Sequence, residues 1–72
     1  MERGENMLFK VDRKAVLMRL VELDLNQKKL AHKAGITPQS ISNIMIGRAA
    51  KAMTIAKIAK ALDMPMENLI KA

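Results

Sequence analysis

Residues Asn26–Gly47, NQKKLAHKAGITPQSISNIMIG, decide the fold of this 72-residue chain because they predict two short helices joined by a tight turn. Asn26 can cap the first helix by accepting a hydrogen bond from a backbone N–H of its first turn. Gly35 stands just past that helix, where a left-handed backbone is needed. Thr37 is placed to cap the second helix, and Pro38 takes its first position, where a missing N–H costs nothing. The stretch therefore predicts where both helices begin and how the chain turns between them.

The two predicted helices, about 27–34 and 38–46, each carry one apolar side. Their inward residues are Leu30, Ala31, Ala34, Ile41, Ile44 and Met45, and the turn between them is filled by Ile36. The opposite side of the second helix holds Gln39, Ser42 and Asn43, which can form hydrogen bonds and carry no charge. A short helix that presents amides and hydroxyls suits the base edges of a DNA major groove.

This stretch resembles the Cro/CI-type (XRE) helix-turn-helix family, which includes phage repressors and many small bacterial regulators. The residues that stand at the family's spacing are Asn26-Gln27, Leu30-Ala31, Gly35, Ile41 and Gly47. The resemblance extends over roughly residues 12–71. It implies an all-α fold, a compact five-helix bundle of the lambda-repressor-like type, and sequence-specific binding of duplex DNA.

The chain is expected to divide into two parts: a short N-terminal arm, residues 1–11, disordered over 1–6, and a helix-turn-helix DNA-binding domain, residues 12–72, with its motif at about 26–47. Within the arm, the apolar segment Met7–Val11 has strand character. It either packs Phe9 and Val11 onto the helices or pairs with the same segment of a second subunit.

Three further helices are expected, at about 13–23, 52–62 and 65–71, with residues 48–51 as a connector. Asp12 can cap the first of them, and the Asp24 that follows it can adopt a left-handed backbone. The expected inward residues are Val16, Leu17, Leu20, Val21 and Leu23 in the first, Ile55, Ile58, Ala59 and Leu62 in the second, and Leu69 and Ile70 in the third.

The charges are distributed unevenly along the chain. The 13 Lys and Arg residues outnumber the 7 Asp and Glu residues, and the formal net charge is +6. No carboxylate lies between Leu25 and Leu62, whereas this stretch carries Lys28, Lys29, Lys33, Arg48, Lys51, Lys57 and Lys60. A polyanion would meet an uninterrupted positive field there. Phe9 is the one aromatic residue, and this scarcity argues against single strands or RNA, whose bases commonly stack on aromatic rings.

The family resemblance implies roles for individual residues. The base-reading candidates are Pro38, Gln39, Ser40, Ser42 and Asn43. The amides of Gln39 and Asn43 can each address adenine at two atoms, and the absence of Arg and Lys from this side favours an A·T-leaning half-site. Phosphate contacts are expected from Gln27, at a helix N-terminus that attracts anions, and from Lys28, Thr37, Arg48 and Lys51.

The chain departs from the family at one pair of positions. Many relatives have an arginine and a glutamate that form a partly buried ion pair where this chain has Leu20 and Met45. Replacing both partners of such a pair by packed apolar residues is often neutral or stabilising. We therefore expect Leu20 and Met45 to touch.

The function expected from these features is that of a transcriptional regulator, a repressor, which binds an inverted-repeat operator as a homodimer. Candidate dimer-interface residues are Ile46, Met53, Met64 and Met66. The alternative is an antitoxin-like or adaptor protein that uses the same fold mainly to bind a protein partner, with Met7–Val11 as the candidate clasp.

Other classes of protein find little support in the sequence. The chain has no cysteine, and its one histidine, His32, has no second histidine beside it, so we expect a surface residue and neither a metal nor a cofactor. No nucleophile–base pair or glycine-rich phosphate loop indicates an enzyme. No apolar run approaches the roughly 20 residues of a membrane span and no signal peptide is visible, so we expect a cytoplasmic protein.

Overall fold

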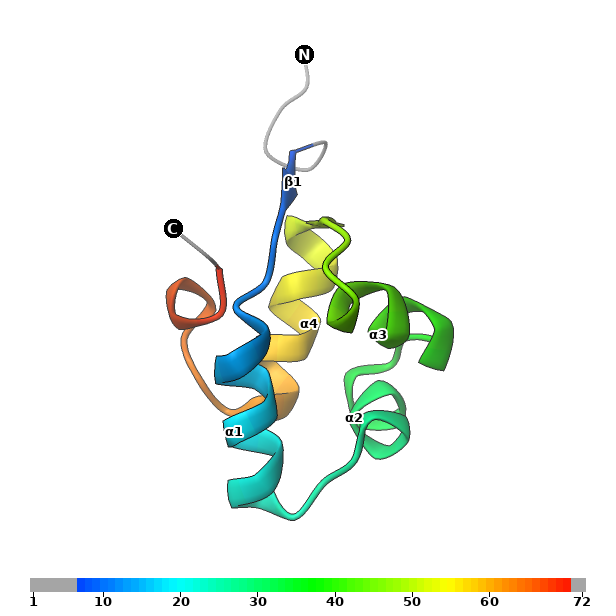
Figure 1. Cartoon of the computed structure of the whole chain (residues 1–72), viewed down its shortest axis with the longest axis vertical. Coiled ribbons are helices and arrows are strands. Elements are labelled where there is room, and N and C mark those ends of the chain that lie inside the picture. Colours follow the sequence, from blue (N-terminus) through cyan, green and yellow to red (C-terminus); the bar gives the residue numbers. More distant parts are fainter. Residues whose placement is uncertain (1–6, 71–72) are drawn as a thin grey trace.

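The computed structural model describes residues 7–70, which form four α-helices, a two-stranded sheet and a short 3₁₀ helix (Figure 1). The α-helices are α1 (Arg13–Leu23), α2 (Gln27–Ala34), α3 (Pro38–Met45) and α4 (Ala52–Leu62). The strands are β1 (Leu8–Phe9) and β2 (Ala50–Lys51), and the 3₁₀ helix is Met66–Asn68. The expected disorder of residues 1–6 lies outside the described residues.

The predicted helix ends are confirmed by the backbone and its caps. A side-chain oxygen accepts a hydrogen bond from the backbone N–H three residues further on, at 3.3 Å for Asp12, 2.7 Å for Asn26 and 3.1 Å for Thr37. Asp24 and Gly35 follow α1 and α2 in the left-handed conformation, with φ values of 57° and 74°. Because these signals are local, the starts of α1, α2 and α3 and the ends of α1 and α2 lie where their flanking residues require.

The core is built around α4, which lies between α1 on one side and α2 and α3 on the other (Figure 1). The buried residues are Val11, Val16, Leu20, Leu30, Ala31, Ile41, Ile44, Ile55, Ile58, Ala59, Ala61, Leu62 and Leu69. Within residues 7–70, no polar or charged side chain is buried. The hydrophobic effect is therefore the main force that holds the helices together.

The expected five-helix, all-α fold is wrong in two respects, of which the first is the fifth helix. Between Pro65 and Ile70, where the described residues end, the chain forms only the 3₁₀ helix, and Ile70 makes an antiparallel β-bridge with Val11. The backbone N–H of Asp12 also donates to the carbonyl oxygen of Leu69 at 2.6 Å. The backbone N–H of Ile70 still donates to the carbonyl oxygen of Met66 at 3.2 Å, so the helical turn stops at the bridge to Val11. The side chain of Leu69 closes the core as predicted.

The second correction is the small antiparallel sheet. Leu8 pairs with Lys51 and Phe9 with Ala50, so β2 lies in the segment predicted to be only a connector. Val11 is buried and Phe9 packs against the core. Of the two expectations for Met7–Val11, packing onto the same chain is therefore confirmed.

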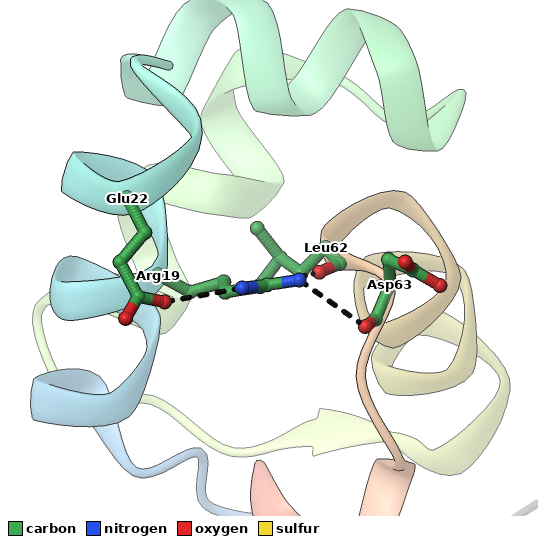
Figure 2. Close-up of polar contacts among 4 residues, drawn as sticks. All are labelled: Arg19, Glu22, Leu62 and Asp63. Atoms are coloured by element: carbon green, nitrogen blue, oxygen red, sulfur yellow. Dashed lines mark hydrogen bonds and ion pairs between the residues drawn. The ribbon is translucent and has the colours of Figure 1, made fainter.

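The buried face of α1 is narrower than predicted. Val16 and Leu20 face the core, whereas Leu17 and Val21, also expected inside, are exposed. The side chain of Arg19 instead reaches the C-terminal end of α4 (Figure 2). Because α1 packs mainly on α4, it can bury only one stripe of side chains.

Candidate nucleic-acid interface

Helices α2 and α3 pack against each other through a turn that leaves their outer faces open (Figure 1). At the turn, the backbone N–H of Ile36 donates to the carbonyl oxygen of Ala31 at 3.0 Å, which closes the end of α2. Leu30 and Ile41 are buried, whereas the N-terminal residues of both helices are exposed. The motif is therefore rigidly anchored on its inner side.

The five base-reading candidates lie on α3, but they are not equally accessible. Pro38, Gln39 and Ser42 are exposed, whereas Ser40 and Asn43 are half-buried. The Nε2 atom of Gln39 donates to the Oδ1 atom of Asn43 at 3.2 Å, so the two amides form one unit. We call the surface formed by Pro38, Gln39, Ser42 and Asn43 the base-reading face.

Ser40 is turned away from this face toward the helix cap. Its hydroxyl oxygen lies 3.0 Å from that of Thr37, and its backbone N–H donates to the same Thr37 oxygen. These contacts hold the start of α3.

Arg48 reaches the edge of the base-reading face. Its Nη1 atom lies 3.5 Å from Oδ1 of Asn43, and its backbone N–H donates to the carbonyl oxygen of Asn43 at 3.0 Å. Gly47, with φ of 103°, turns the chain back at this point. α3 itself carries no Arg or Lys, but Arg48 places a cation beside its outer face. The preference for an A·T-leaning half-site stays a prediction.

The five phosphate candidates, Gln27, Lys28, Thr37, Arg48 and Lys51, are all exposed. Gln27 occupies the first position of α2, and Lys51 lies in β2. Since Lys51 is paired with Leu8, β1 fixes the segment that carries both Lys51 and Arg48. The pairing of β1 with β2 could not be predicted from local sequence, because the two strands are far apart in the chain.

β1 also lies close to the base-reading face. A shallow hollow beside α3 is lined by Leu8 together with Ser40, Asn43, Ala49 and Thr54. The strand character of Met7–Val11 was the only signal in the sequence for this arrangement, and it did not identify the partner strand.

The acidic residues lie outside the elements that carry the candidate contacts. Those in the described part of the chain are Asp12, Glu22, Asp24, Asp63 and Glu67, which lie at the ends of α1, after α4 and in the 3₁₀ helix. Helices α2 and α3 and strand β2 carry no carboxylate. The side of the molecule that presents the motif is therefore positive, as the binding of a polyanion requires.

The candidate dimer residues do not form a uniform surface. Met64 and Met66 pack partly buried against the core, whereas Ile46 and Met53 are exposed. Sequence analysis did not select the exposed residues of α1, because it assigned Leu17 and Val21 to the core.

Leu20 and Met45 belong to the same apolar core, in which Leu20 is buried and Met45 is half-buried. Their direct contact stays a prediction. The end of α3 has a further tether, since the Nη1 atom of Arg13 donates to the carbonyl oxygen of Met45 at 3.3 Å.

The described residues offer no group of three or more His, Cys, Asp or Glu placed to hold a metal ion, and His32 is exposed. Among the same residues, none of the helices combines the length and the apolar character needed to cross a bilayer.

Comparison with known proteins identifies one family. The family model described as helix-turn-helix matches residues 17–69, which is more than half of the chain and includes α2 and α3. A search of curated proteins and a search of solved structures found no match.

Proposed function

Because the chain belongs to the Cro/CI-type helix-turn-helix family of DNA-binding regulators, we propose that it is a sequence-specific repressor that inserts α3 into the major groove of duplex DNA as a homodimer. The observation that carries the proposal is the division of α3 into two faces. Ile41 and Ile44 anchor it to the core, and the outer face presents the linked amides of Gln39 and Asn43.

The amide pair supports base reading because it is already oriented. The hydrogen bond from Gln39 to Asn43 uses one donor and one acceptor. The Oε1 atom of Gln39 and the Nδ2 atom of Asn43 remain to address a base edge, and adenine offers the matching donor and acceptor. Pro38 and Ser42 would contact neighbouring bases, whereas Ser40 would support the start of α3 through its contact with Thr37.

The phosphate contacts would position α3 without reading sequence. Gln27 adds its side chain to the N-terminal N–H groups of α2, where an anion is favoured. Lys28 and Thr37 would flank the same strand, and Arg48 and Lys51 would reach the backbone on the other side of α3.

A homodimer would present two copies of α3 to half-sites about one helical turn apart, so the operator would be an inverted repeat. Occupying such a site would exclude other proteins from the same DNA, which is the simplest route to repression for a domain of this size.

The alternative of a protein-binding adaptor relied on Met7–Val11 as a clasp. In the described structure, β1 is paired with β2 of the same chain, and Val11 belongs to the core. Because β1 is already paired within the chain, it is not available as a free strand for a protein partner. These contacts therefore favour the regulator.

Selection from a random pool of duplexes at about 150 mM salt tests the proposal, because non-specific attraction weakens as salt rises. We expect the bound fraction to be enriched in an inverted repeat. Enrichment of a lone half-site would contradict the homodimer. The absence of any enriched sequence would contradict specific DNA binding altogether.

A further inference from the structure

Helix α1 carries an apolar stripe that no part of the described structure covers. Leu17, Met18 and Val21 are 48%, 58% and 80% exposed. Val21 neighbours Leu17 at i+4 and Met18 at i+3, so the three side chains share one side of the helix about 100° wide. Large apolar residues that are exposed singly are normal, but three that adjoin on one helix mark a surface for contact.

The charges of α1 run against the dipole of the helix. Lys14 lies in the first turn and Glu22 in the last, and beyond the N-cap Asp12 the first turn of α1 holds no acidic residue and its last turn no basic one. A helix dipole favours the reverse order, with acids at the N-terminus and bases at the C-terminus. The helix dipole therefore does not explain the positions of Lys14 and Glu22.

We propose that the stripe binds a second copy of the chain, with the two α1 helices antiparallel about a two-fold axis between Leu17 and Met18. In this register, Val21 of one subunit lies over Lys14 of the partner subunit. The stem of Lys14 can pack on that valine while its ammonium group meets Glu22 of the partner subunit. The two helix dipoles are then antiparallel, and each basic end meets an acidic end.

A hollow at the N-terminal end of the stripe fits this arrangement. It is lined by Val11, Asp12, Arg13, Lys14, Leu17 and Met45. The register brings Val21 of the partner subunit to Lys14 and Leu17, at the side of this hollow. The most exposed apolar residue of α1 would thus fill the nearest depression in the partner.

Glu22 can serve this contact without giving up its bond within the chain. Its Oε1 atom accepts from the Nη1 atom of Arg19 at 3.1 Å (Figure 2). Arg19 is itself held by the carbonyl oxygens of Leu62 and Asp63. Glu22 is exposed, and its second oxygen remains for Lys14 of the partner subunit.

This inference rests on the homodimer of the proposed function and specifies its surface, and its test needs no DNA. The chain has no cysteine, so single-cysteine variants of the full chain report contacts cleanly. Met18→Cys lies next to the two-fold axis. Met53→Cys is the matched control, because Met53 is 63% exposed against 58% for Met18 but lies on α4.

Under mild oxidation we expect Met18→Cys to form a covalent dimer and Met53→Cys to remain monomeric. A disulfide needs Cα atoms within about 4.4–6.8 Å, a separation that residues beside the axis of a close helix pair can reach. Equal cross-linking of the two variants, or preferential cross-linking of Met53→Cys, would overturn the proposal.

The dimer dissociation constant provides a second measurement, made by sedimentation on chains without an introduced cysteine. We expect Lys14→Glu to raise the dimer dissociation constant about tenfold, because it places like charges together. The double change Lys14→Glu and Glu22→Lys should restore the wild-type constant. A chain that stays monomeric at every concentration, or a double variant weaker than the single one, would overturn the α1 interface. Sequence enrichment in the DNA selection would then still support specific DNA binding.

Discussion

The Nε atom of Arg19 donates to the carbonyl oxygen of Leu62 at 2.8 Å, so a side chain of α1 closes the C-terminal end of α4 (Figure 2). Its Nη2 atom also reaches the carbonyl oxygen of Asp63 at 3.4 Å. A cation at this point satisfies carbonyl groups that have no partner within the helix and complements the helix dipole. The contact joins the two helices whose packing supports the motif.

We expect Arg19→Ala to lower the free energy of unfolding by about 1–2 kcal/mol, because hydrogen bonds from a charged donor to helix carbonyls are lost. Urea denaturation measures the change. Arg13→Ala is the control, since its bond to Met45 is longer, at 3.3 Å, and exposed. A loss no larger than that of the control would show that Arg19 does not stabilise α4.

Two left-handed positions should respond in opposite directions. Gly35→Ala should destabilise the protein by about 1 kcal/mol, because alanine is disfavoured at a φ of 74°. No atom lies within 4 Å of the added Cβ, so the backbone alone sets this cost. Asp24→Gly, at a φ of 57°, should be neutral or stabilising. Thermal unfolding of the two variants measures both changes in stability. A Gly35→Ala variant as stable as the wild type would contradict this account of the turn.

Val11 links the N-terminal strand to the core. We expect Val11→Ala to cost about 1–2 kcal/mol, because a buried side chain that packs beside the bridge to Ile70 is shortened. Leu8→Ala, at an exposed position of β1, is the matched control and should change the stability little. Chemical denaturation distinguishes the two, and similar losses would mean that β1 is not anchored through Val11.

Lys51 tests the proposed phosphate contacts. Lys51→Ala should weaken binding to all duplexes alike and lower the slope of log affinity against log salt by about 1. Lys60→Ala is the control, because Lys60 lies in the last turn of α4, outside α3 and β2. This variant should leave the slope unchanged. Fluorescence anisotropy over a salt series provides the slopes. Equal slopes for Lys51→Ala and the wild type would exclude Lys51 from the contact.

The parts of the fold that the sequence predicted correctly are those controlled by neighbouring residues. Asp12, Asn26 and Thr37 cap their helices through bonds to residues three positions away. Asp24 and Gly35 adopt left-handed conformations for equally local reasons. Local sequence therefore located α1, α2, α3 and α4 closely.

The errors arose where distant residues compete with local preference. The segment after Pro65 has a helical pattern, but it forms only a short 3₁₀ helix before Ile70 makes the bridge with Val11. Similarly, α1 has more apolar residues than its packing, mainly on α4, can bury, so Leu17 and Val21 remain outside. No periodicity in one segment reveals which partner it will meet.

The sequence predicted the base-reading face on α3 from the capping and turn residues. It did not predict that Arg48 lies beside this face. Arg48 follows Gly47 and lies outside the helical pattern, and it is the turn at Gly47 that brings its guanidinium beside Asn43. The roles of these residues on DNA stay proposals.

The central claim is that α3 reads base sequence, and Gln39 tests it most directly because its side chain is exposed and its loss leaves the core intact. The measurement is the sequence motif selected from random duplexes by Gln39→Ala, compared with the motifs of the wild type and of Lys28→Ala. We expect Gln39→Ala to lose its preference at one position of each half-site, at a cost of about 1–3 kcal/mol for the preferred base. Lys28→Ala should retain the complete motif with weaker binding. An unchanged motif for Gln39→Ala would contradict the claim.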